Sequence, residues 1–115
     1  MNYTQEQVNN IVTEARTAAR VAAEKFFKER LGGQDQYACG FAWVNVWGVR
    51  SNSKVGKFLQ ANGFRKDYTG ALSLWNPSGF PTQSISILEA GAEAYAEVLK
   101  NKLGLDKVYA GSRMD

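Results

Sequence analysis

The chain contains no histidine and only one cysteine, Cys39. Catalysis by a Ser-His-Asp triad or a Cys-His pair is therefore excluded, and so is proton transfer by an imidazole near neutral pH. A structural zinc site usually takes four cysteine, histidine or carboxylate ligands, so we expect no such metal site. A single cysteine also excludes a disulfide within the chain, which fits a reducing compartment.

Long apolar runs are missing as well. No stretch approaches the roughly 20 apolar residues that a membrane-spanning helix needs. The first residues lack the cationic segment followed by an apolar one that marks a signal peptide. We therefore expect a cytoplasmic protein that has no membrane partner.

The residues that are present are typical of a globular domain. Hydrophobic residues make up 44% and charged residues 22% of the 115 positions. A chain of this length is enough for one domain, residues 1–115, with one core. The three Trp, five Tyr and six Phe argue against disorder, because burying aromatic rings offsets the entropy lost on folding. The net charge of +3 permits a nucleic-acid partner without requiring one.

A long amphipathic helix is predicted over residues 5–31. Thr4 and Gln7 match a capping box at its start, and apolar residues recur at helical spacing after it. Gly32 and Gly33 end it, because glycine readily takes the left-handed conformation found at helix ends. The apolar side is rich in alanine and can pack closely on a sheet, on another helix or on a second copy of the chain. A homodimer through this helix is therefore one alternative.

Residues 41–49 predict a central strand, because they combine aromatic and β-branched residues. On one side lie Phe41, Trp43, Asn45, Trp47 and Val49, and on the other Ala42, Val44, Val46 and Gly48. Both sides are mostly apolar, so we expect helices to cover the strand on at least one side. Core packing is then the expected role of Trp43 and Trp47.

Four further elements follow this strand. They are a short helix that ends at residues 62–63, a strand over residues 71–75, a helix from a capping box of Ser86 and Glu89 to Gly104, and a final strand over residues 107–112. The order α-β-α-β-α-β predicts a single small α/β or α+β domain with a three-stranded sheet packed by helices. The helical connections favour parallel pairing for at least one pair of strands.

The turn after the first strand is a candidate anion site. Arg50, Lys54 and Lys57 surround a helix start whose backbone N–H groups attract negative charge. Ser51, Asn52 and Ser53 are all suitable N-caps, so a capped helix with solvated cations is the alternative. A Walker-type nucleotide site is excluded, because the glycine spacing is too long and Phe58 stands where Ser or Thr should bind magnesium.

A second candidate combines aromatic and basic residues that are spread over the chain. Its aromatic members are Trp43, Trp47, Trp75 and Tyr68, and its basic members are Arg65, Lys66 and the cations of the turn. Bases stack on aromatic rings, while arginine and lysine hold phosphates. Tryptophans exposed on a sheet would form a platform for single-stranded nucleic acid. The alternative is that all of these tryptophans belong to the core.

Five segments, residues 39–50, 63–68, 74–78, 90–96 and 109–115, give the chain a wider resemblance. It resembles a group of short proteins that tailed bacteriophages encode and to which no activity is assigned. The resemblance implies an origin in a phage genome and action in the cytoplasm of the host cell. It carries no catalytic residue across to this sequence.

The hypothesis that follows is a non-enzymatic accessory protein of phage type. It would bind a nucleic acid or a nucleotide-like anion at the basic strand-to-helix turn. The alternative is a protein-interaction module, a homodimer through the first helix, that modulates a host or phage partner. No pair of acidic or hydroxyl residues is brought together by its spacing, so we predict no catalytic residue, no metal and no cofactor. An enzyme that uses carboxylates or a lysine is disfavoured by the absence of histidine.

Overall fold

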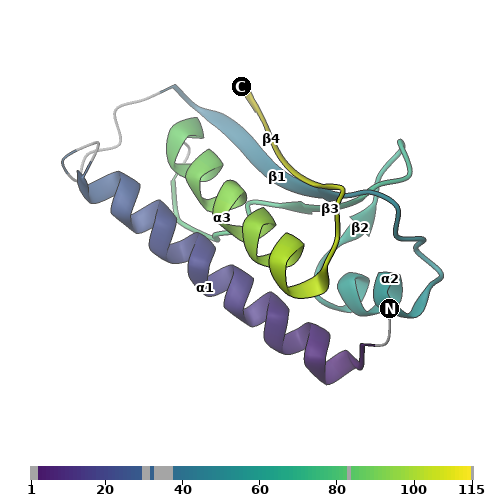
Figure 1. Cartoon of the computed structure of the whole chain (residues 1–115). Helices are drawn as coiled ribbons and strands as arrows, with labels where there is room; N and C mark the ends of the chain where they lie inside the picture. Colours follow the sequence, from purple (N-terminus) through teal and green to yellow (C-terminus); the bar gives the residue numbers. More distant parts are fainter. Residues whose placement is uncertain (1–2, 30–31, 33–37, 83, 115) are drawn as a thin grey trace.

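The structure, a computed structural model, describes residues 3–29, 32, 38–82 and 84–114. Its elements in chain order are α1 (Gln5–Glu29), β1 (Gly40–Val46), α2 (Lys54–Ala61), β2 (Arg65–Lys66), β3 (Leu72–Trp75), α3 (Ile85–Leu103) and β4 (Val108–Met114). Figure 1 shows α3 between the sheet and α1, so the helices lie in layers on one side of the sheet. The predicted class is confirmed as a small α+β domain.

The sheet has four strands in the order β2-β3-β1-β4, and every neighbouring pair is antiparallel. The predicted three-stranded sheet is wrong in its count, because β2 has only two residues and no apolar alternation. The predicted parallel pair is also wrong. The helical connections do join strands that run the same way, β1 to β2 and β3 to β4. In each case another strand lies between them, so no two of the described strands are parallel neighbours.

Helix α1 begins as the sequence predicts. The Thr4 backbone N–H donates to Gln7 Oε1 at 2.9 Å, and the Gln7 N–H donates to Thr4 Oγ1 at 3.1 Å. The helix is described to Glu29, and the predicted end at residues 30–31 lies outside the described residues.

The alanine-rich side of α1 packs against α3 of the same chain. Ala15, Ala19 and Ala23 are fully buried there. A Cβ added at Gly91 of α3 would lie 3.3 Å from the Ala19 carbonyl oxygen, so the two helices approach closely. The surface that the sequence offered for a homodimer is therefore occupied within the chain. Dimerisation itself stays a prediction and would need another surface.

Helix α3 begins one residue after Ser84. The predicted capping box of Ser86 and Glu89 is wrong, because Ser86 already lies in the first turn. The start is set by a tertiary bond instead, in which the Ile85 N–H donates to the Ala38 carbonyl at 2.9 Å, next to β1. The predicted end is confirmed, since Gly104 has a left-handed φ of 63°.

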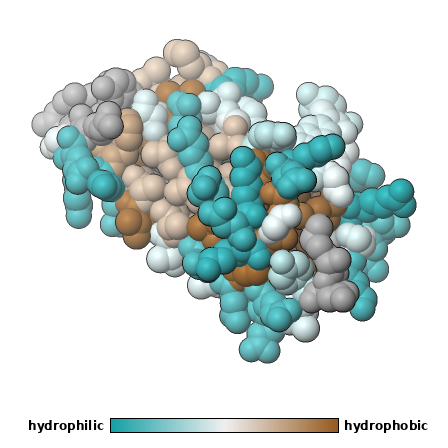
Figure 2. Space-filling view, in the orientation of Figure 1, coloured by the Kyte–Doolittle hydropathy of each residue, from teal (hydrophilic) through white to brown (hydrophobic). Residues whose placement is uncertain are grey.

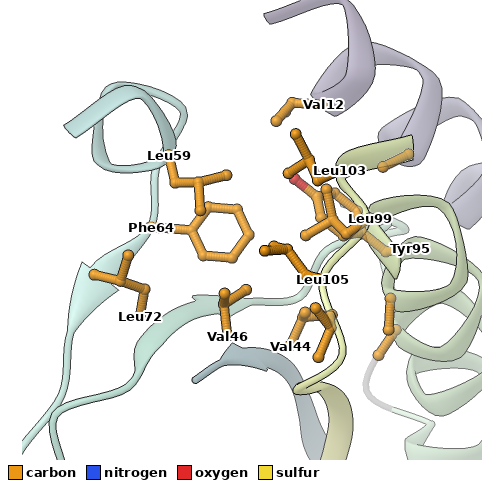
Figure 3. Close-up of a cluster of buried hydrophobic side chains, with 14 of the residues drawn as sticks. Val12, Val44, Val46, Leu59, Phe64, Leu72, Tyr95, Leu99, Leu103 and Leu105 are labelled. Atoms are coloured by element: carbon orange, nitrogen blue, oxygen red, sulfur yellow. The ribbon is translucent and has the colours of Figure 1, made fainter. Parts of the chain in front are cut away.

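The core lies between the sheet and the helices. Val44 and Val46 of β1 meet Phe64, Tyr95 and side chains of α1, α2 and α3 there (Figure 3). Hydrophilic side chains are spread over the outer surface, with hydrophobic residues showing between them (Figure 2). Among the described residues, no helix is both long and apolar enough to cross a membrane.

Candidate functional site

The first strand alternates sharply between a covered and an uncovered side. Ala42, Val44 and Val46 are buried under the helices, whereas Trp43 is only half-buried on the opposite side. The prediction that Trp43 and Trp47 belong to the core is therefore wrong. The physical reason is that α1 packs on α3 and not on the second face of the sheet, so that face has no helical cover among the described residues.

Aromatic rings gather on this open face of the sheet. Trp43 pairs with Trp75 across β1 and β3, and their ring centroids are 5.0 Å apart. Phe41 meets Trp75 edge to face at 5.8 Å. Rings at these separations attract one another and hold a fixed arrangement. We call Phe41, Trp43, Trp47 and Trp75 the aromatic platform.

The platform remains accessible even though Phe41 and Trp43 both contact the Trp75 ring. Trp75 is 55% exposed, Phe41 39% and Trp47 37%. Soluble monomeric proteins rarely expose several large apolar rings on one surface, and such groups often mark a binding surface. Beyond β1, Tyr109 of the edge strand β4 is 53% exposed, and it lines a hollow at the edge of the sheet together with Glu97 and Lys100 of α3.

Gly111 of β4 makes room for the platform. A Cβ added at Gly111 would lie 2.5 Å from Trp43 Nε1 and 2.7 Å from Trp43 Cε2. The Trp43 indole therefore lies across β4, directly over the glycine backbone. Any larger residue at position 111 would push the ring away.

A hollow of about 340 Å³ opens among these rings. It is lined by Trp43, Asn45, Trp47, Asp67, Tyr68, Thr69, Ser73, Trp75 and Arg113. Its volume is at the lower end of the range for small-molecule sites. It combines flat apolar walls with a few polar groups, which is the usual composition of a ligand site.

The polar part of the hollow is one connected network. Ser73 is buried, and its hydroxyl donates to Asp67 Oδ2 at 3.0 Å and also contacts Asn45 Oδ1. Asp67 Oδ1 accepts from the backbone N–H groups of Thr69 at 2.9 Å and Ala71 at 3.1 Å. The hydrogen bond from the Thr69 hydroxyl is the main cause that lowers the pKa of Asp67 below 3.8, against a smaller opposing effect of burial. Asp67 is therefore an anion near neutral pH.

The same contacts shape the loop between β2 and β3. The Asp67 N–H donates to the Ala71 carbonyl at 2.9 Å, which closes the loop. Tyr68 stands at its tip and is fully exposed, yet its side chain lines the hollow. The loop therefore holds an aromatic ring at the rim of the hollow.

Cations surround the platform on several sides. The Arg113 guanidinium carbon is 5.8 Å from the Phe41 ring centroid. Arg65 is opposite Ser73 in the register of β2 and β3, which places it on the open face. Lys107 lines a smaller hollow beside Trp47. Lys100 of α3 lies outside this set, because it contacts the Tyr109 ring at the edge of the sheet, with Nζ 5.7 Å from the ring centroid.

At the predicted anion site, the turn has the capped helix start that the sequence offered as the alternative. Anion binding there stays a prediction. Ser53 is the N-cap of α2, and its Oγ accepts from the Gly56 N–H at 3.0 Å and donates to the Arg50 carbonyl at 2.6 Å. The helix start is therefore already capped by the chain. Arg50, Ser53 and Lys54 line a shallow hollow of their own.

The remaining predicted site residues lie either at the aromatic hollow or at the turn before α2. The tryptophans and Tyr68 meet at the aromatic hollow, and Arg65 shares its face. Ser51 is tied to α2, since its carbonyl accepts from Gln60 Nε2 at 2.6 Å. Asn52 is exposed just before α2, and Lys57 is exposed within it. Lys66 is opposite Leu72, which places it on the other side of the sheet from Arg65.

Shared residues connect the aromatic hollow with the turn. Trp47 lines both the aromatic hollow and the smaller hollow beside Lys107. Gly48 lines that smaller hollow and also the one that contains Arg50 and Lys54. The three hollows therefore follow one another along the molecule, from Arg113 to the basic turn.

Several residues of this surface were not predicted as site residues. They are Phe41, Asn45, Asp67, Ser73, Lys107 and Arg113. The alternation of the final strand carried a signal, because Lys107, Tyr109, Gly111 and Arg113 share one side of it. No local sequence pattern indicated that Trp43 lies opposite Gly111, because the register of two strands depends on the whole sheet.

Among the described residues, no group of three or more Cys, Asp or Glu side chains could hold a metal ion. The resemblance to phage proteins stays an expectation, because the chain matches no protein-family model, no curated protein and no solved structure.

Proposed function

We propose that this protein binds single-stranded nucleic acid on the open face of its sheet. Unpaired bases stack on Trp75, Trp47 and the rest of the aromatic platform, while Arg113, Arg65 and Lys107 contact phosphates. The observation that carries the proposal is the group of exposed tryptophan rings on the uncovered face, with cations around it. An accessory role of phage type in a host cell is part of the same proposal.

Single strands fit this surface better than a duplex does. A duplex hides the faces of its bases within its own stack, whereas the platform offers flat rings to bases that are already separated. The chain of hollows also suits an extended strand, because it leads from Arg113 past Trp47 to Arg50 and Lys54. The net charge of +3 favours a polyanion as well.

Stacking alone would give weak binding. Each stacked base contributes roughly 1–3 kcal/mol, so two bases contribute roughly 2–6 kcal/mol. A dissociation constant of 1 μM needs about 8 kcal/mol. The cations must therefore contribute, and affinity should fall as salt rises. With about three phosphate contacts, affinity falls about 20-fold between roughly 50 and 200 mM salt.

The test is a fluorescence-anisotropy titration with labelled single-stranded oligonucleotides and with duplexes of the same sequence. We expect Trp75→Ala to weaken single-strand binding by about 5- to 150-fold. Arg113→Ala should lower the salt dependence by about one phosphate contact. Lys25→Ala removes an exposed charge on α1 and serves as the matched control, which should bind as the parent does. Equal binding by the parent and by Trp75→Ala, or no binding at low salt, refutes the proposal.

One observation favours the alternative of a protein-interaction module. Strand β4 is an edge strand of seven residues, and no described strand pairs with its outer side. Such an edge can accept a strand from a second copy or from another protein. Light scattering of the parent chain and of Ser112→Pro tests this. A dimer that the substitution dissociates would support strand pairing, whereas a monomer at all concentrations would count against a homodimer.

A further inference from the structure

The polar network in the aromatic hollow has more hydrogen-bond acceptors than protons to donate to them. The Ser73 hydroxyl has one proton, and two oxygens lie beside it, Asn45 Oδ1 and Asp67 Oδ2. A hydroxyl proton donates fully to one acceptor only. The other oxygen is then left against the Ser73 oxygen without a proton between them.

Asp67 is the stronger of the two acceptors. Its carboxylate is charged, and hydrogen bonds to a charged acceptor are about twice as strong as those between neutral groups. Its position is also fixed, because the Thr69 and Ala71 N–H groups hold its other oxygen. The Ser73 hydroxyl therefore donates its proton in a hydrogen bond to Asp67 Oδ2.

Asn45 can then bond to Ser73 only as a donor. A half-turn of its side-chain amide exchanges Oδ1 and Nδ2, which have nearly the same size and shape. After this turn Nδ2 donates to Ser73 Oγ, so the Ser73 hydroxyl accepts from Asn45 and donates to Asp67. The Asn45 carbonyl oxygen now faces the hollow, which Asn45 lines.

The hollow then presents acceptors to a ligand. Asn45 offers a neutral carbonyl oxygen, and Asp67 contributes negative charge close by. A ligand that places a carbonyl oxygen there would be repelled, whereas one that places an N–H group there would be held. The walls of Trp43, Trp47, Trp75 and Tyr68 suit a flat ring.

We infer that the hollow selects a base with an exocyclic amino group, and that it binds cytosine or adenine in preference to thymine or uracil. The amino group donates to Asn45 Oδ1 while the ring stacks on the platform. Thymine and uracil have a carbonyl oxygen on each side of the ring N3–H. These oxygens would be repelled by Asn45 Oδ1 and by the Asp67 carboxylate. This inference rests on the proposed function, since it names the bases that the same surface prefers.

The test compares (dC)8 with (dU)8 at pH 7.5 by fluorescence anisotropy. The two bases have the same ring size, and at this edge an amino group replaces a carbonyl. One hydrogen bond of about 1–1.5 kcal/mol corresponds to a preference of about 5- to 13-fold for (dC)8. Asn45→Ala should lower the affinity for (dC)8 to that for (dU)8. Lys25→Ala is the control and should keep the preference.

The outcomes separate this inference from the proposed function. Equal affinity of the parent protein for the two oligonucleotides, or tighter binding of (dU)8, overturns the base preference and leaves single-strand binding intact. A preference for (dC)8 that persists in a folded Asn45→Ala variant also overturns it. Failure of the parent to bind either oligonucleotide at low salt overturns the proposed function and the preference together. Circular dichroism of each variant checks the fold.

Discussion

Gly111→Ala should displace one ring of the aromatic platform without removing any side chain. In the parent protein the Trp43 indole lies over Gly111, and an added Cβ would be 2.5 Å from Nε1. Ordinary contact begins at 3.4 Å, so the ring has to retreat by about 0.9 Å. It cannot move freely, because Trp75 lies on its other side with the centroids 5.0 Å apart.

Three effects set the size of the change in stability. Overpacking a close contact costs about 1–3 kcal/mol. Weakening the Trp43–Trp75 pair costs about 0.5–1.5 kcal/mol at most. Replacing glycine by alanine lowers the entropy of the unfolded chain and offsets about 0.4–1 kcal/mol of this loss. The three effects together give a net destabilisation of about 2 kcal/mol, within bounds of about 0.5–4 kcal/mol, and a loss of about 2 kcal/mol lowers Tm by roughly 8 °C.

The assay combines thermal unfolding with near-ultraviolet circular dichroism, which reports the packing of indole rings. Ser112→Ala is the matched control, because it alters the next residue of β4 on the opposite side of the sheet. We expect Gly111→Ala to change the tryptophan signal and to weaken oligonucleotide binding by about 5-fold or more. If both variants keep the parent Tm and the parent tryptophan spectrum, the indole does not lie over Gly111 and the reasoning is wrong.

Three further predictions concern the rest of the fold. Tyr95→Phe removes a buried hydroxyl that has no partner among the described residues, so Tm should rise by about 4 °C in a thermal melt, and a fall would refute this. Asp67→Asn should lower Tm at pH 7. Because folding lowers the Asp67 pKa, the difference from the parent should shrink as the pH falls below 3.8, and a difference independent of pH would contradict the assignment. Ser53→Ala removes the α2 cap and should lower the free energy of unfolding, measured with urea, by about 1 kcal/mol. An unchanged free energy of unfolding would show that Ser53 does not cap the helix.

The helix ends show how far local sequence signals extend. The capping box of Thr4 and Gln7 and the stop at Gly104 follow from a few neighbouring residues, and both predictions are confirmed. The capping box at Ser86 matched the same pattern and is wrong. There a bond between the Ile85 N–H and the distant Ala38 carbonyl sets the start of the helix. A local pattern predicts a helix end only where no tertiary bond competes for the same backbone groups.

The candidate site depended still more on long-range structure. The residue types of a stacking surface were visible in Trp43, Trp47, Trp75 and Tyr68, and so was the side of the strand that carries the first two. The contact between Asn45 and Ser73 was not predicted, because the two residues come from strands that are far apart in sequence. Nothing near Gly111 indicated that it makes room for Trp43.

The sequence by itself determined the alternation of β1, the positions of the helices and the absence of histidine chemistry. These depend on residue type and on the fixed periods of strands and helices, which act over a few residues. Only the tertiary structure decided which face of the sheet is covered. Helix α1 packs its alanines on α3 and leaves the second face open. An apolar strand face looks the same in sequence whether a helix or solvent meets it, so the role of the tryptophans rested on that packing.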